Sequence, residues 1–279
     1  MNSSFYPAIN GIATLNWQEQ VSDFYRQDKA LAITVGLNLI LVVCMLVILP
    51  FDSRLVMGSN PWIKPIKFAL SFALYAFTIA RLLQYLRLSN VGKKIISWGV
   101  SACIIIQIIC ITTQSARGTT SHFNMTTPAN AAIGITMDIL DPLNGVFVVA
   151  LLIFACLAMY DVTRPSLWAI RAGLAIFLGA SVIGVMMVAY GAHSVGVADG
   201  GPGLPLLDWS TTGGDLRVAH FVGLHALQVL PVCAWLIGKL DGWTVSQKTG
   251  SVIALSVVYS LIVVILYLQA IHGAPLLKV

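Results

Sequence analysis

The sequence has few charged residues. Asp, Glu, Lys and Arg make up only 10% of its 279 residues, whereas hydrophobic residues make up 58% and the mean hydropathy is +0.86. About a quarter of the residues of a soluble domain are charged, so this composition excludes a soluble globular fold. We therefore expect a multi-pass protein of a cell membrane, and specifically of a bacterial inner membrane.

Cysteine motifs and familiar catalytic motifs are also missing. The five cysteines lie in apolar stretches without a CxxC pair, which excludes a disulfide framework and the covalent attachment of c-type haem. Walker, GxSxG and HExxH motifs are absent, which argues against the nucleotide hydrolases, serine hydrolases and metalloproteases that use them. No lysine lies near the middle of the last apolar segment, so a retinal Schiff base has no attachment point.

Long apolar segments dominate the rest of the chain. A helix that crosses a hydrocarbon core of about 30 Å needs roughly 20 mostly apolar residues. The segments that qualify are 29 to 50, 65 to 86, 94 to 115, 140 to 160, 168 to 191, 218 to 238 and 250 to 271. We predict an all-α fold with a seven-helix transmembrane domain over residues 29 to 279 and an N-terminal interfacial segment over residues 1 to 28. That first segment lacks an uninterrupted apolar core, so we expect no cleavable signal peptide.

Basic residues are distributed unequally between the two ends of these segments. The end that carries the N-terminus holds Arg26, Lys29, Arg81, Arg87, Lys93, Lys94, Arg164, Arg171, Lys239 and Lys248. At the other end, Arg54, Lys64, Lys67, Arg117, Arg217 and Lys278 are matched by as many acidic residues. Because basic residues are retained on the cytoplasmic side, we predict that the N-terminus is inside and the C-terminus outside. The net charge of +5 then faces an anionic lipid leaflet, and nothing indicates a nucleic-acid partner.

The histidines share one end of the predicted bundle. All five, His122, His193, His220, His225 and His272, lie at or near the outer end of an apolar segment. Neutral imidazole is a common ligand of iron, copper and zinc. This distribution indicates a polar site near the outer face, with haem or a transition metal (Fe, Cu or Zn) as the expected cofactor.

Three basic residues flank the first part of this site. Lys64 and Lys67 are three residues apart, so they share a face at the outer N-terminus of the second span, where a helix end favours anions. Arg117 follows the third span. We interpret all three as candidates for binding a phosphate, a carboxylate or the propionates of haem, although the lysines could instead extend toward lipid headgroups.

Two carboxylates precede the fourth predicted span. Asp138 and Asp141 stand just before Pro142, so we expect them at the outer boundary together with His122. Asp141 ahead of a proline is also typical of a helix start, which gives it a capping role as an alternative. Asp138 is kept as a candidate catalytic residue.

The connection before the sixth span is the richest in Gly and Pro, which favours fixed turns. Asp215 and Arg217, followed by His220 and His225, crowd the start of that span, and we take the first two as catalytic candidates. Five residues of helix place His225 about 7 Å deeper than His220 and about 140° away. His220 and His225 therefore cannot chelate one ion from adjacent turns of the same helix, as a pair four residues apart could. We predict His122, His220 and His225 as metal ligands and expect His225 to face the interior of the bundle. The alternative for His225 is a neutral histidine that forms a hydrogen bond between helices.

Three classes of function fit these observations. The first is a membrane oxidoreductase with haem or a transition metal held by histidines. The second is a zinc-dependent intramembrane hydrolase, in which three ligands leave one position for an activated water. The third is a transporter or receptor that binds a small molecule in an outer pocket. We expect the first class, while the oligomeric state is left open.

Overall fold

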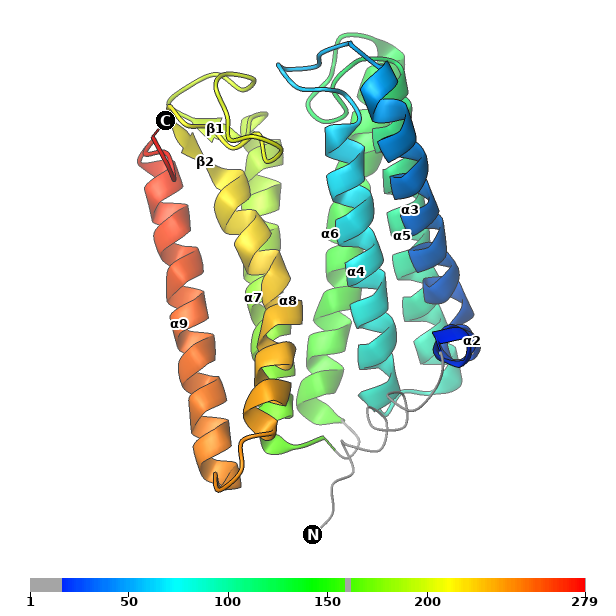
Figure 1. Ribbon diagram of the computed structural model, residues 1–279, viewed down its shortest axis with the longest axis vertical. Helices are drawn as coiled ribbons and strands as arrows, with labels where there is room; N and C mark the ends of the chain where they lie inside the picture. Colours follow the sequence, from blue (N-terminus) through cyan, green and yellow to red (C-terminus); the bar gives the residue numbers. More distant parts are fainter. Residues whose placement is uncertain (1–16, 159–161, 279) are drawn as a thin grey trace.

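Eight helices make up most of the chain that the structure describes. The computed structural model describes residues 17 to 158 and 162 to 278 (Figure 1). The helices are α2 (Trp17–Gln27), α3 (Lys29–Ile48), α4 (Ile63–Tyr85), α5 (Asn90–Ala116), α6 (Pro128–Leu157), α7 (Arg164–Tyr190), α8 (Leu216–Gly238) and α9 (Val245–Ile271). A short 3-10 helix, η1 (Leu49–Phe51), extends α3. Seven of the helices, all but α2, are long and apolar enough to cross a membrane, which confirms the predicted all-α bundle of seven spans.

The long helices form two groups that lie side by side. Figure 1 shows α3, α4, α5 and α6 on one side and α7, α8 and α9 on the other. Within the second group α7 and α8 approach closely through small residues: a Cβ added to Gly173 would lie 3.0 Å from the carbonyl oxygen of Ala226. Small side chains at such positions let helix backbones pack tightly in apolar surroundings.

Side chains near the middle of α4 contact α7 and α8 and so connect the two groups of helices. The ring of Tyr75 in α4 stacks on Phe177 in α7, with centroids 5.5 Å apart. In addition, Gln228 of α8 donates a hydrogen bond of 3.2 Å from Nε2 to Oγ1 of Thr78 in α4. Leu227 of α8 belongs to the same buried cluster. The main apolar core is therefore centred on α4, with buried residues from α5, α6 and α7 and Leu227 from α8.

The start of the fourth long helix differs from the expected one. Helix α6 begins at Pro128 rather than near residue 140, and its N-cap is Thr127, whose side chain accepts a hydrogen bond from the backbone N–H of Asn130. The prediction was wrong because Pro142, which lies inside α6, was taken as a start signal. At about 1.5 Å per residue, Asp138 and Asp141 lie roughly 15 and 20 Å along the helix. Asp141 accepts a hydrogen bond of 2.5 Å from Gln107 and caps nothing.

One end of the bundle carries most of the irregular chain. We call it the loop-rich end; it consists of residues 52 to 62, 117 to 127, 191 to 215 and 272 to 278 (Figure 1). Within it, β1 (Ser194–Val195) pairs antiparallel with β2 (Gly214–Asp215). A Cβ on Gly214 would lie 1.9 Å from the carbonyl oxygen of Ala270, so only glycine allows β2 to contact the end of α9.

Helix α2 lies at the opposite end of the bundle from the C-terminus (Figure 1). Asp28 separates it from α3 and caps α3 by accepting a hydrogen bond of 3.0 Å from the backbone N–H of Leu31. Phe24 of α2 packs against Phe77 of α4, with ring centroids 5.3 Å apart. A helix therefore exists where the interfacial segment was predicted, and its place at a membrane surface stays a prediction.

Candidate functional site

The five histidines do lie at one end of the bundle, but their imidazoles do not converge. Nδ1 of His220 donates to the carbonyl oxygen of Ala180 at 2.7 Å. His225 and His272 make bonds of the same length to carbonyl oxygens one turn earlier in their own helices. In residues 17 to 158 and 162 to 278, no three His, Cys, Asp or Glu side chains lie close enough to hold one metal ion. His122, His220 and His225 are thus not brought together as the predicted ligand set.

Asp215 organises the start of α8. Its side chain is fully buried, and its Oδ1 accepts the backbone N–H of Arg217 at 3.0 Å. Its Oδ2 accepts the backbone N–H of Ser210 at 2.8 Å and pairs with the Arg217 guanidinium at 2.6 Å. A carboxylate with these partners satisfies the free N–H groups of a helix start. The structure therefore gives Asp215 and Arg217 a clear role in holding the loop before α8.

The same network reaches α4 through Lys67. Its ammonium pairs with the Asp208 carboxylate at 2.8 Å and donates to the carbonyl oxygens of Leu206 and Leu207. Asp208 also accepts a hydrogen bond from the Ser59 hydroxyl, and its backbone carbonyl accepts one from the Arg217 guanidinium. Lys67 is thus neutralised by the chain itself and ties the segment before α8 to the start of α4.

Two further predicted residues lie apart from this network. Arg117 follows the last turn of α5, is exposed, and donates to the side-chain oxygen of Gln114 at 2.8 Å. Asp138 lies within α6, three residues before Asp141. In residues 17 to 158 and 162 to 278, neither Arg117 nor Asp138 hydrogen-bonds to Lys64 or Lys67, so the structure does not gather the nine predicted residues into one site.

Lys64 has a histidine as its hydrogen-bonding partner. Its Nζ lies 3.1 Å from Nδ1 of His122, and within the described part of the chain it forms no ion pair. The ammonium also lies 6.0 Å from the ring centroid of Phe68. By contrast, Lys67, Arg217 and Arg54 are each paired with an aspartate.

The loop that carries His122 is rigidly built. Asn124 is buried and donates to Oγ1 of Thr119 at 2.8 Å and to the carbonyl oxygen of Thr120 at 3.1 Å. Phe123 has a φ of 58°, a left-handed conformation that is rare for a bulky residue. Such strain persists only where surrounding contacts impose it, and it is common at functional sites. All four described non-glycine residues with positive φ lie at the loop-rich end: Met57, Phe123, Leu206 and Asp208.

A histidine and an aspartate stand next to this loop. Nδ1 of His193 donates to Oδ2 of Asp199 at 2.7 Å, and the Asp199 carboxylate also accepts the backbone N–H groups of His193 and Ser194. The rings of His193 and Phe123 lie 4.9 Å apart. We call Lys64, Phe68, His122, Phe123 and the His193 and Asp199 pair the Lys64 cluster.

The protonation of the cluster follows from these contacts. Burial, together with the Lys64 ammonium and His193, holds the pKa of His122 well below the usual value of a histidine. Burial also lowers the pKa of His193, although its bond to Asp199 acts in the opposite direction. Burial acts to raise the pKa of Asp199, but the hydrogen bonds from His193 and Ser194 outweigh it and hold that pKa below the usual range. Near neutral pH the imidazoles of His122 and His193 are therefore uncharged.

The sequence predicts His193 only as a residue near a helix end, and it indicates no functional role for Asp199. The signal that could have found them is their spacing: six residues apart in a glycine-bearing segment, the two can form a local hydrogen-bonded pair. Their approach to Phe123, by contrast, joins segments 70 residues apart and leaves no local pattern in the sequence.

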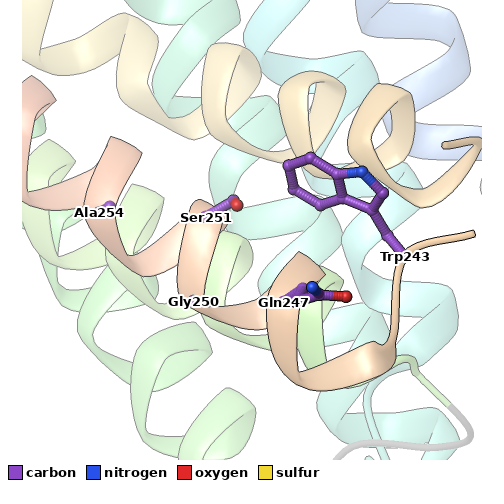
Figure 2. A pocket seen from close by; sticks show the side chains of 5 residues that line it. All are labelled: Trp243, Gln247, Gly250, Ser251 and Ala254. Carbon is purple, nitrogen blue, oxygen red and sulfur yellow. The ribbon is translucent and has the colours of Figure 1, made fainter.

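A surface pocket lies at the opposite end of the bundle. Trp243, Gln247, Gly250, Ser251 and Ala254 line it, at the start of α9 and in the turn before it (Figure 2). None of these side chains is titratable, and Trp243 is exposed in a manner common at a membrane surface. This pocket therefore offers no group for acid, base or metal chemistry.

Comparison of the chain with known protein families, curated proteins and solved structures finds no match. The functional argument therefore depends on the geometry of the Lys64 cluster.

Proposed function

We propose that this protein is a membrane receptor or transporter that binds a small organic anion at the Lys64 cluster. The observation that carries the proposal is the position of Lys64, whose Nζ has the imidazole of His122 as its hydrogen-bonding partner in place of a carboxylate. A half-buried cation loses hydration, and a bound anion would restore favourable electrostatics through a charge-assisted hydrogen bond.

The start of α4 adds to the preference for an anion. Its N-cap, Trp62, makes no side-chain capping bond, and its first turn has no acidic residue. The N-terminus of a helix carries a partial positive charge, so an anion beside Lys64 is stabilised by the backbone as well as by the ammonium.

The neighbouring rings indicate the kind of anion. The ring centroid of Phe68 in α4 lies 5.9 Å from that of His122, and the ring centroid of Phe123, the residue after His122, lies 6.1 Å from it. Aromatic side chains bind apolar or aromatic groups, while a few polar groups fix the orientation of a ligand. An organic carboxylate with an apolar part fits this combination better than an inorganic ion.

We further propose that the loop-rich end faces the outside of a bacterial inner membrane. The opposite end holds Lys93, Lys94, Arg164, Lys239 and Lys248 among its basic residues. Such an excess of basic residues marks the cytoplasmic side of short connections. The ligand would then arrive from the outer solution.

The geometry favours this proposal over the two metal-dependent classes. A zinc hydrolase needs three protein ligands around one ion, and a copper or non-haem iron centre needs histidines that converge. The described histidines bond instead to separate carbonyl groups, to Lys64 and to Asp199.

Binding of benzoate to the protein in a non-ionic detergent tests the proposal. We expect measurable affinity by calorimetry, and we expect Lys64→Met to weaken it at least about tenfold, which corresponds to about 1.4 kcal/mol. Lys278→Met is the matched control, because it removes an exposed charge from the same end and should leave affinity unchanged.

Two results would contradict the proposal. One is the same benzoate affinity in wild type and Lys64→Met, or no binding of benzoate and acetate to the wild type. The other is competitive displacement of benzoate by phosphatidylglycerol, which would assign the Lys64 cluster to an anionic lipid headgroup.

A further inference from the structure

The position of His193 is fixed by its own backbone and by the start of α8. Its carbonyl oxygen accepts the backbone N–H group of Leu216 at 3.0 Å. Its own backbone N–H group donates to the Asp199 carboxylate at 2.9 Å, and that of Ser194 donates to the same carboxylate at 2.8 Å. The ring of Phe123 lies beside the imidazole, with centroids 4.9 Å apart. The imidazole is therefore held in place before any ligand binds.

The hydrogen bond to Asp199 decides which ring nitrogen of His193 carries the proton. Nδ1 lies 2.7 Å from Oδ2 of Asp199. That carboxyl group already accepts two backbone N–H groups and is ionised at neutral pH, so it can only accept. Nδ1 is therefore the donor. In the uncharged imidazole the other nitrogen, Nε2, then has a free lone pair and acts as an acceptor.

Nε2 of His193 is open to a ligand. Within residues 17 to 158 and 162 to 278 the hydrogen bonds of His193 involve its backbone and Nδ1 but not Nε2. In the same part of the chain, the buried side-chain nitrogen and oxygen atoms without a partner are Asn38 Oδ1 and Ser101 Oγ. Since Nε2 of His193 is not among them, it is accessible, and the His193 side chain is 17% exposed.

This acceptor belongs to the same cluster as Lys64. The ring of Phe123 lies between the two histidines in the contact order, 4.9 Å from that of His193 and 6.1 Å from that of His122. Nζ of Lys64 is in turn 3.1 Å from Nδ1 of His122. Burial opposes positive charge at the His193 ring, and so does the neighbouring Arg217 guanidinium. A donor that suits Nε2 is therefore an uncharged hydroxyl group and not an ammonium group.

We infer that the anion bound at the Lys64 cluster carries a hydroxyl group, which donates a hydrogen bond to Nε2 of His193. This inference rests on the proposed function and narrows its ligand class to hydroxylated organic acids. A ligand without a hydroxyl group would displace water from Nε2 and leave the acceptor without a partner. Sites built to hydrogen-bond a hydroxyl group discriminate against analogues that lack it for this reason.

Calorimetry in a non-ionic detergent at neutral pH compares benzoate with its meta- and para-hydroxy derivatives. We expect the wild type to bind at least one hydroxybenzoate about fivefold more tightly than benzoate, as one additional hydrogen bond allows. The corresponding methoxybenzoates are the control ligands. They fill the same space but have no proton to donate, so they should show no gain over benzoate.

His193→Asn removes the acceptor but keeps a link to Asp199. The side-chain amide nitrogen of asparagine takes the place of Nδ1 and can still donate, while nothing stands at the position of Nε2. We expect the ratio of hydroxybenzoate affinity to benzoate affinity to fall to about one in this variant. His272→Asn is the matched control. It changes an exposed histidine at the same end, bonded to Leu268 in its own helix, and should keep the fivefold preference.

The outcomes separate this inference from the proposed function. Equal affinities of the wild type for benzoate and for both hydroxybenzoates overturn the inference and leave the proposed function intact. An equal gain from the methoxybenzoates, or a preference that persists in His193→Asn, also overturns it. Absence of binding of all these ligands to the wild type overturns both. The comparison of ligands on the wild type decides the matter even if His193→Asn does not fold.

Discussion

At the scale of single residues, two lysines three positions apart have different partners. The ammonium of Lys67 pairs with Asp208, whereas that of Lys64 contacts His122. The spacing in the sequence predicts a shared face for both and cannot distinguish them. Only the loop before α8, which brings Asp208 to one lysine and not the other, separates a structural cation from a candidate ligand-binding one.

Asp215 is the residue whose loss should destabilise the protein most. Asp215→Ala removes the cap of α8 and leaves Arg217 without its buried partner, so we expect a loss of about 3 to 5 kcal/mol in the free energy of unfolding. Asp215→Asn keeps an oxygen for the cap and should lose less. Denaturant titration in mixed micelles measures both. Exposed Asp241→Ala serves as the control, and equal stability of Asp215→Ala and this control would refute the role given to Asp215.

Asp199 should stabilise the loop-rich end in a pH-dependent way. Its pKa is lower in the folded protein than in the unfolded chain, so its contribution is complete above the unfolded value of about 3.9 and is lost as the pH falls further. We expect Asp199→Asn to lower Tm by about 2 to 4 °C at neutral pH. The difference in Tm between the two proteins should begin to shrink below about pH 4 and continue to shrink as the pH falls further. A difference that stays constant down to pH 3 would show that the charge of Asp199 contributes nothing.

At the scale of elements, close packing of α7 and α8 depends on glycine. A Cβ on Gly223 would lie 2.5 Å from the Cβ of Ala180, and one on Gly184 would lie 2.8 Å from Cε1 of His220. Both glycines therefore make room for the neighbouring helix or for a side chain on it. Because His220 fills the space beside Gly184, its position at this interface is set by packing as much as by its bond to Ala180.

Substitution of glycine by alanine tests this packing with an internal control. Gly223→Ala should destabilise the protein by about 1 to 3 kcal/mol, because the added methyl group forces the helices apart. Gly179→Ala, in the partner helix α7 and with no atom within 4 Å of the added Cβ, should be neutral or stabilising by up to about 1 kcal/mol. Unfolding titrations compare the two. Equal effects at both positions would mean that α7 and α8 are not held at this distance.

The length of α6 shows why an element boundary could not be predicted. Asp141 followed by Pro142 is a common start of a helix, yet here the helix has already run from Pro128. Gln107 of α5 accommodates Asp141 by donating a hydrogen bond to it. The sequence shows Asp141 but not its neighbour on another helix, so local capping rules gave the wrong start.

At the scale of the whole molecule, the apolar segments predicted the bundle because length and hydropathy act locally along the chain. The candidate site could be predicted only in part. The histidines were correctly placed at one end, but the contact of Lys64 with His122 joins residues 58 positions apart. The approach of Phe123 to His193 depends on how α6 and α7 pack. Such contacts depend on tertiary structure, so they cannot be predicted from the spacing of residues in a sequence motif.

The distribution of charge over the molecule leads to the last prediction, which concerns orientation. Basic residues are concentrated at the end opposite the loop-rich end, as expected for a cytoplasmic face. Ala198→Cys lies in an exposed loop of the loop-rich end, and Ser246→Cys lies in the exposed first turn of α9 at the other end. A maleimide that cannot cross membranes should label the first in intact cells and the second only after lysis.

The unsubstituted chain, with its five native cysteines, gives the background for this labelling. The reverse pattern would place the loop-rich end in the cytoplasm. Lys64 would then face an internal ligand, and the protein would release or sense an anion of the cell interior. Labelling thus decides the direction from which the ligand reaches His122. The labelling result does not depend on whether benzoate binds. It reports the orientation of the protein in the membrane, which follows from the basic residues in the loops between the helices and not from the chemistry of the Lys64 cluster.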